Sequence, residues 1–169
     1  NAAARNFESV VVGVVGIALA QAVYSPLSQA AAKKDRGLYV YYLRKAVMYA
    51  FCLTIIGAII LVAATPIAAS LVSLQHVVMS FGIALTVYAL AIPFESINHL
   101  LLRAYYALKE TMLPAVSTVI AGISAIVITW ILLPRLGLYA IAAGFAAGQI
   151  VQTIGLSVML KTRVRRLGA

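Results

Sequence analysis

The chain has 169 residues, of which 64% are hydrophobic and only 10% are charged, and it carries a formal net charge of +9. Typical soluble domains are about 45–50% apolar and about 25% charged, so this composition argues against a soluble globular domain. The basic residues lie at the ends of apolar runs and not along one exposed face interleaved with aromatics, which argues against a nucleic-acid partner.

Five stretches are long and apolar enough to cross a hydrocarbon core of roughly 30 Å as helices of about 20 residues. In chain order they are 10–32, 46–74, 77–102, 111–134 and 136–160. Lipid offers no partner for backbone polar groups and the runs are too long for barrel strands, so helices are expected. The predicted fold is all-α, a single polytopic transmembrane bundle of about five spans. Because the chain begins at Asn1 and not at Met, we expect it to be a fragment of a longer protein.

Short polar segments separate the predicted spans. The first ends at Lys33–Gly37, Lys109 and Glu110 lie between the third and fourth, and Pro134–Gly137 forms a tight connection before the fifth. A very short turn at Ser73–His76 separates the second from the third.

The basic residues segregate strongly when the five spans alternate in direction. Arg5 and Arg135 fall on one side, and eleven residues fall on the other: Lys33, Lys34, Arg36, Arg44, Lys45, Arg103, Lys109, Lys161, Arg163, Arg165 and Arg166. The positive-inside rule then predicts that the N-terminus lies outside and the C-terminus in the cytoplasm. We expect a multi-pass membrane protein in contact with membrane lipids.

Small residues recur at helical spacing in three of the spans. They are Gly13, Gly16 and Ala20, then Ser117, Ala121 and Ala125, and finally Ala140, Gly144 and Gly148. Such rows let membrane helices approach closely. They indicate either plain bundle packing or surfaces that slide when the protein changes shape.

Polar residues inside the third span form the main candidate site. Glu95, His99 and Arg103 recur every four residues after Pro93, with Asn98 beside them, and Pro93 can kink the helix. Ionisable groups at membrane depth are costly and usually face a bundle interior or a cavity. The stripe is therefore either a structural pair near the cytoplasmic interface or a lining for a substrate or ion cavity.

Two further groups are weaker candidates. Gln149, Gln152 and Thr153 form a polar stripe on the fifth span, which interhelical hydrogen bonding explains at least as well as substrate contact does. A second group, predicted to be an interfacial aromatic belt, consists of Tyr39, Tyr41 and Tyr42 beside Arg44 and Lys45.

The sequence shows no machinery for chemical catalysis. The single cysteine, Cys52, and the two histidines form no metal-ligand cluster. No nucleophile is paired with a base and no glycine-rich phosphate loop is present. We expect a protein that is not an enzyme and that uses neither a metal nor a cofactor.

Three segments carry a resemblance to a known family. Arg103-Ala-Tyr-Tyr-Ala-Leu-Lys-Glu-Thr-Met-Leu-Pro114 resembles the Arg-Ala-Phe-Tyr-Ala-Leu-x-Asp-Thr-x-x-Pro segment of the MurJ (MviN) proteins, lipid II flippases of the multidrug/oligosaccharidyl-lipid/polysaccharide exporter superfamily. The stretch from Gly16 to Ala20 with Pro26-Leu-Ser28, and the stretch from Leu133 to Gly144, are similar to two further family segments.

The resemblance implies a two-lobe exporter of about fourteen spans that moves an undecaprenyl-linked peptidoglycan precursor across the membrane by alternating access. This chain would correspond to most of the second lobe and would need the first lobe as its partner. Arg5 lies about one residue from a family arginine, so the resemblance makes it a substrate candidate together with Glu95, Asn98, His99, Arg103, Gln149 and Gln152. The connection between the second and third spans is shorter than is usual in the family.

The sequence is also compatible with other functions. Within transport, the cargo could be a polysaccharide, an O-antigen or a drug, each handled by other members of the superfamily. A non-transporting membrane scaffold is a different class, and an integral-membrane enzyme would need a catalytic cluster that the sequence does not show.

Overall fold

The computed structural model describes residues 2–71 and 78–168, and every element within them is helical. The elements are α1 (Ala2–Val11), a π-helix (Val12–Ile17), α2 (Ala18–Ala32), α3 (Arg36–Ala63), α4 (Thr65–Leu71), α5 (Val78–Ala107), α6 (Met112–Leu136), α7 (Tyr139–Arg165) and a 3-10 turn (Arg166–Gly168). Five helical segments in the described chain are long and apolar enough to cross a membrane. The predicted all-α bundle of about five spans is therefore confirmed.

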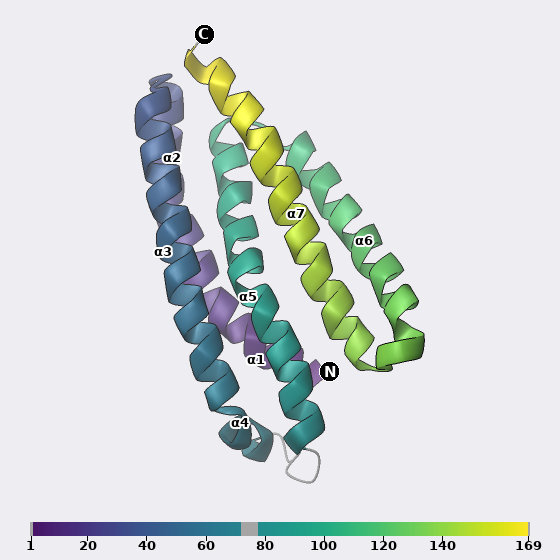
Figure 1. Ribbon diagram of the computed structural model, residues 1–169. Coiled ribbons are helices and arrows are strands. Elements are labelled where there is room, and N and C mark those ends of the chain that lie inside the picture. The colour runs from purple at the N-terminus through teal and green to yellow at the C-terminus, as the bar shows by residue number, and fades with distance from the viewer. Residues whose placement is uncertain (1, 72–77, 169) are drawn as a thin grey trace.

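Helix α5 is the centre of the bundle. It contacts α1, α2, α3, α4 and α7, whereas α6 packs mainly on α7 (Figure 1). Large side chains of α5 such as Leu85, Ile92, Leu100 and Tyr105 are fully buried. By contrast, α6 keeps exposed apolar residues along its length, among them Trp130 at 77% exposure. An apolar surface of this kind is unfavourable in water but stable in lipid, so the exposed apolar side chains of α6 are those expected of a membrane helix.

The first span begins earlier than the hydropathy pattern indicates. It runs as one helical segment from Ala2 to Ala32 and not from residue 10, because Arg5 pairs with Glu8 and with Glu95 of α5, so the charged residues do not end the helix. A single π-helical segment interrupts it at Val12–Ile17. Such segments are rare and occur mostly as local bulges in longer helices.

The expected second span, 46–74, is not one continuous helix. Asp35 caps α3, its carboxylate accepting a hydrogen bond from the Leu38 amide at 2.9 Å, so the helix begins ten residues earlier than expected. It ends at Ala63, because Pro66 has no N–H to donate to the Val62 carbonyl; the Thr65 hydroxyl donates to that carbonyl instead, at 2.6 Å. The chain then continues as α4, and the predicted turn at 73–76 lies outside the described residues.

The remaining three spans are each longer than the apolar runs that predicted them. The predicted ranges 77–102, 111–134 and 136–160 become α5, α6 and α7, which extend to Ala107, Leu136 and Arg165. Pro134 lies inside the last turn of α6 and does not end it. The helix stops at Gly137, whose φ of +53° is accessible to glycine at low cost. The tight connection is thus Gly137 and Leu138.

Pro93 lies midway along α5, where Figure 1 shows the helix changing direction. A proline in a helix interior removes one backbone hydrogen bond and crowds the preceding turn. The predicted kink of the third span is therefore present, and it lies next to the candidate polar residues.

Small residues bring neighbouring helices into close contact. A β-carbon added at Gly144 would lie 2.6 Å from the Ala125 carbonyl oxygen, and one at Gly148 would lie 2.9 Å from the Ala121 carbonyl oxygen. The rows predicted on the fourth and fifth spans therefore face each other across the α6–α7 contact. In the first span only Gly16 is tight, because a β-carbon at Gly13 would meet nothing within 4 Å.

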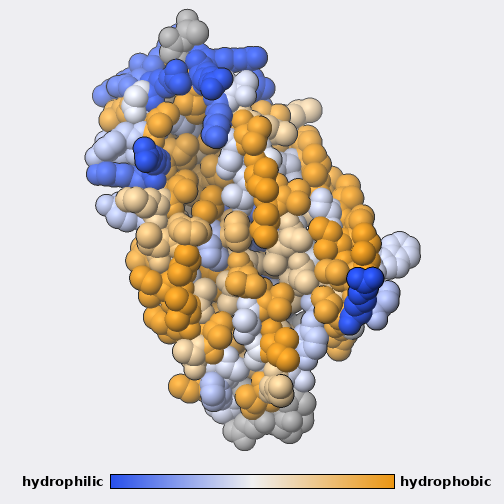
Figure 2. Space-filling view, viewed as in Figure 1, coloured by the Kyte–Doolittle hydropathy of each residue, from blue (hydrophilic) through white to orange (hydrophobic). Residues whose placement is uncertain are grey.

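One end of the bundle is strongly basic. The α2–α3 and α5–α6 connections and the C-terminal end of α7 meet there, and Figure 2 shows hydrophilic atoms gathered at this end above a belt of hydrophobic ones. An ion pair of 3.2 Å between Arg163 and Glu110 ties α7 to the α5–α6 connection. The alternation of the helices thus collects the basic loops at one end, as the sequence predicted.

The predicted aromatic belt is only partly correct. Tyr41 is exposed, as expected of an interfacial side chain, and Lys45 Nζ lies 4.6 Å from the centroid of its ring. Tyr39 is fully buried, and its hydroxyl donates to the Ala104 carbonyl at 2.7 Å. Tyr39 is therefore a core residue that joins α3 to α5.

Candidate functional site

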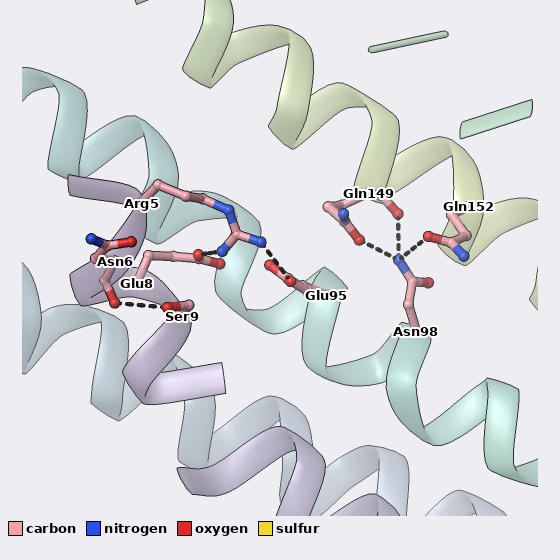
Figure 3. A network of polar contacts seen from close by, with 8 residues as sticks. All are labelled: Arg5, Asn6, Glu8, Ser9, Glu95, Asn98, Gln149 and Gln152. Atoms are coloured by element: carbon pink, nitrogen blue, oxygen red, sulfur yellow. Dashed lines mark hydrogen bonds and ion pairs between the residues drawn. The ribbon is translucent and has the colours of Figure 1, made fainter. Parts of the chain in front are cut away.

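A buried charge cluster joins the first and third spans. Arg5 and Glu8 lie one turn apart on α1, and the Arg5 guanidinium donates to both Glu8 and Glu95 of α5 (Figure 3). The distance from Arg5 Nη2 to Glu95 Oε1 is 3.0 Å. One arginine thus holds two carboxylates that come from two different helices.

The three side chains differ in exposure. The Glu8 side chain is completely buried and that of Glu95 is 13% exposed, whereas that of Arg5 is 32% exposed. Glu8 Oε1 and Glu95 Oε2 are buried and have no hydrogen-bond partner among the described residues. The cluster therefore has one positive and two negative formal charges, with the positive group nearest the surface.

An aromatic ring supports the guanidinium. Arg5 Cζ lies 4.3 Å from the ring centroid of Phe145 on α7, and Tyr88 of α5 packs against the same ring with centroids 5.8 Å apart. The ring face attracts the cation and leaves its hydrogen-bonding edge free for carboxylates. Arg5 thus connects α1, α5 and α7.

A second polar node lies between α5 and α7, one turn further along α5. The Asn98 amide donates to Gln149 Oε1 at 2.8 Å and to the Gln149 carbonyl at 3.0 Å (Figure 3). The Thr153 hydroxyl donates to Asn98 Oδ1 at 2.8 Å. Gln152 donates to Thr118 of α6 at 3.0 Å. This node stabilises contacts between three helices through interhelical hydrogen bonds.

The predicted polar stripe on the third span therefore divides in two. Glu95 turns toward Arg5 of α1, whereas Asn98 is buried and turns toward α7. His99 and Arg103 are half-buried on the face that Glu95 begins. Within residues 2–71 and 78–168, neither has a hydrogen bond or ion pair, although His99 is near enough to Glu95, Arg103 and Arg5 to interact electrostatically. Arg103 thus has no ion-pair partner among the residues that the structure describes, and it lies two turns from the charge cluster toward the basic end.

Sequence reasoning missed two members of the site. Glu8 lies three residues after Arg5, a spacing that puts both on one helix face, but the first span was expected to begin only at residue 10. Phe145 carries no signal in a chain this apolar, because its role depends on where α7 lies relative to α1. Around these groups, no cluster of three or more metal-ligand side chains occurs in the described residues.

Comparisons with known proteins agree with one another. A family model described as "Lipid II flippase MurJ" matches residues 4–168. A solved structure titled "Lipid II flippase MurJ, inward closed conformation" superposes with a TM-score of 0.77 at 21% sequence identity. It covers 98% of this chain, which spans 37% of the length of that protein.

No curated protein matches this chain by sequence. The identity to the solved structure is low enough that the superposition shows a shared fold, and the family model adds the sequence evidence over nearly every residue. The resemblance found in the sequence is confirmed: this chain belongs to the MurJ lipid II flippase family.

Proposed function

We propose that this chain is most of the second lobe of a transporter that carries lipid II, the undecaprenyl-linked peptidoglycan precursor, across the bacterial inner membrane. Membership of the family supports the cargo. The observation that carries the mechanism is the Arg5 guanidinium, held inside the bundle and left one-third exposed. The carrier would work without chemical catalysis, a metal or a cofactor.

The charge cluster gives a physical reason for binding and release. A pyrophosphate oxygen accepts the same N–H bonds that Glu8 and Glu95 accept, so cargo and carboxylates compete for Arg5. A permanently free arginine at this depth would be costly in an empty carrier. Two carboxylates lower that cost in the empty carrier, and displacing them from Arg5 costs free energy because both are largely buried, which weakens headgroup binding enough for release.

The cargo path would run along α5 from the basic end to Arg5. Arg103 and His99 lie two turns and one turn from Glu95 on one helix face, and Arg103 has no ion-pair partner in the described residues. An anionic headgroup entering from the basic end would meet Arg103 first and Arg5 last. In this arrangement the Asn98 node with Gln149 and Gln152 holds the helices together and does not contact cargo.

The membrane orientation follows from the same charge distribution. Since basic loops are retained in the cytoplasm, the basic end faces the cytoplasm and the N-terminal end of the first span faces outward. Rocking of this lobe against a first lobe would then present Arg5 alternately to the two sides, as in other two-lobe carriers.

Complementation tests the cargo directly. The full-length protein, produced in a strain depleted of its own lipid II flippase, is expected to restore growth and murein synthesis. Arg5→Ala should abolish rescue, and Arg135→Ala, which removes an exposed arginine at the opposite end, should leave it intact. Membrane levels of each variant, measured by immunoblotting, separate lost transport from lost protein.

Two outcomes would contradict the proposal. In the first, the well-expressed wild-type protein fails to restore murein synthesis and exports a polysaccharide, O-antigen or drug instead. Lipid II would then not be the cargo. In the second, Arg5→Ala gives full rescue. Lipid II would then remain the proposed cargo, but Arg5 would not contribute to binding it.

A further inference from the structure

A groove at the basic end of the bundle lies outside the charge cluster. It is formed by α3 and α7, which Figure 1 shows on either side of α5, and it encloses about 430 Å³. Two cations from each wall line it: Arg36 and Arg44 from α3, and Lys161 and Arg165 from α7. The two arginines of α3 lie eight residues apart and the two cations of α7 lie four apart, so each pair is on one face of its helix.

These four cations have no acidic partner in the part of the chain that the structure describes. A neighbouring cavity at the same end differs in this respect, because its Arg163 is paired with Glu110. Four like charges around one opening repel one another, and a bound anion would relieve that repulsion.

The floor of the groove is apolar. Leu101 of α5 and Leu160 of α7 are buried beneath it, and Leu43 of α3 adds to the same surface. The groove thus combines a cationic rim at the polar end of the bundle with an apolar base that continues toward the hydrophobic belt.

We propose that this groove binds an anionic phospholipid from the leaflet at the basic end, with its phosphate between the four cations and an acyl chain along the leucine floor. Basic pockets between membrane helices recognise anionic headgroups in this way. A free phosphate would leave the apolar floor without a contact. A further protein helix would need acidic residues to satisfy the rim. The inference concerns a structural lipid, and it does not depend on which cargo the transporter carries.

The preference of the protein for an anionic over a zwitterionic lipid tests whether the groove binds phospholipid. The full-length protein is reconstituted in phosphatidylcholine vesicles that contain a trace of spin-labelled phosphatidylglycerol or spin-labelled phosphatidylcholine, and electron paramagnetic resonance gives the immobilised fraction of each. The wild-type protein should prefer phosphatidylglycerol. Arg44→Gln with Lys161→Gln should lower that preference by about fivefold for each cation removed.

A matched control removes the same charge elsewhere. Lys33→Gln with Arg166→Gln neutralises two exposed cations at the same end that do not line the groove. This variant should keep the wild-type preference. Equal losses in the two double variants would show a general surface attraction and overturn the proposal, as would an unchanged preference in Arg44→Gln with Lys161→Gln.

A charge-neutral variant tests the apolar half of the site. Val40 is exposed on the α3 wall, so Val40→Trp can fill the groove without disturbing the core. It should reduce immobilised phosphatidylglycerol although every cation remains. If Val40→Trp has no effect, or if inorganic phosphate displaces the labelled lipid, the groove is an anion site and not a lipid site.

Discussion

Gly16 of the π-helical segment lies directly against Ser96 of α5. A β-carbon at residue 16 would be 2.5 Å from Ser96 Oγ and 3.0 Å from Ser96 Cα, distances that only glycine permits without movement. Ser96 is fully buried and its hydroxyl has no hydrogen-bond partner in the described chain. This contact fixes how closely the first span approaches α5, one residue along α5 from the carboxylate that binds Arg5.

Gly16→Ala should destabilise the folded protein by about 1–3 kcal/mol, because the new methyl group overpacks a contact that includes backbone. Unfolding in mixed detergent micelles measures the change. Gly13→Ala in the same π-helical segment is the control, since nothing lies within 4 Å of its added carbon. Ser96→Gly should recover part of the loss in Gly16→Ala; equal stability of the two alanine variants would contradict the close contact.

The α6–α7 contact is expected to be equally sensitive. Gly144→Ala places a methyl group against Thr129 Oγ1 and 2.6 Å from the Ala125 carbonyl oxygen, so it should lower the free energy of unfolding by about 1–3 kcal/mol. Gly122→Ala on the open face of α6 should change the stability by less than about 1 kcal/mol, as the substitution favours helix and meets no atom within 4 Å. Unfolding in the same micelles distinguishes them, and similar costs at both sites would be inconsistent with this packing.

Removing Arg5 alone should destabilise the protein more than removing all three charges of the cluster together. Arg5→Ala leaves two buried carboxylates without a cation, and breaking a buried pair in this way costs about 3–5 kcal/mol. Adding Glu8→Gln and Glu95→Gln to Arg5→Ala should restore much of the stability, because no unpaired charge is then buried. Unfolding of the single and triple variants measures the coupling. A triple variant no more stable than Arg5→Ala would show that the cluster is not held by charge.

Asn98→Ala should loosen α5 from α7. It removes the donor to Gln149 and the acceptor of Thr153, and interhelical hydrogen bonds in membranes contribute about 1–2 kcal/mol at most. We expect a stability loss of this size with rescue of a flippase-depleted strain retained. Ser124→Ala, which removes a hydroxyl bonded only within its own helix, is the control. Loss of transport with unchanged stability would instead place Asn98 in the cargo path.

Local signals in the sequence predicted the helices well and their ends less well. Apolar runs located all five spans, yet Arg5 and Glu8 were taken to lie before the first one because charged residues lower the hydropathy of any window. The break at Ala64 had a signal in Thr65 and Pro66, which the apolar composition around them obscured. In both places the error arose because hydropathy is averaged over many residues, whereas a single ion pair or proline decides where a helix begins or ends.

The candidate residues were mostly identified, but their grouping was not. Glu95 and Asn98 were assigned to one stripe, and the structure directs them to different helices. Three residues along a helix correspond to about 300° of rotation, so side chains at this spacing can contact different neighbours on a helix surrounded by others. Tyr39 was misassigned for a related reason, since position near a boundary does not show which side faces the core.

The sequence by itself determined that this protein is a bundle of five membrane helices with one basic end, because the transfer of apolar residues into lipid and the satisfaction of backbone hydrogen bonds within each helix are local properties. Only the tertiary structure decided that Arg5 binds Glu95, 90 residues away, and that Asn98 binds α7 instead. Those pairings depend on how closely the helices approach, which the Gly16–Ser96 and Gly144–Thr129 contacts fix, and on the angle at which α5 bends at Pro93. Such distances arise from packing between distant segments, so no single segment encodes them.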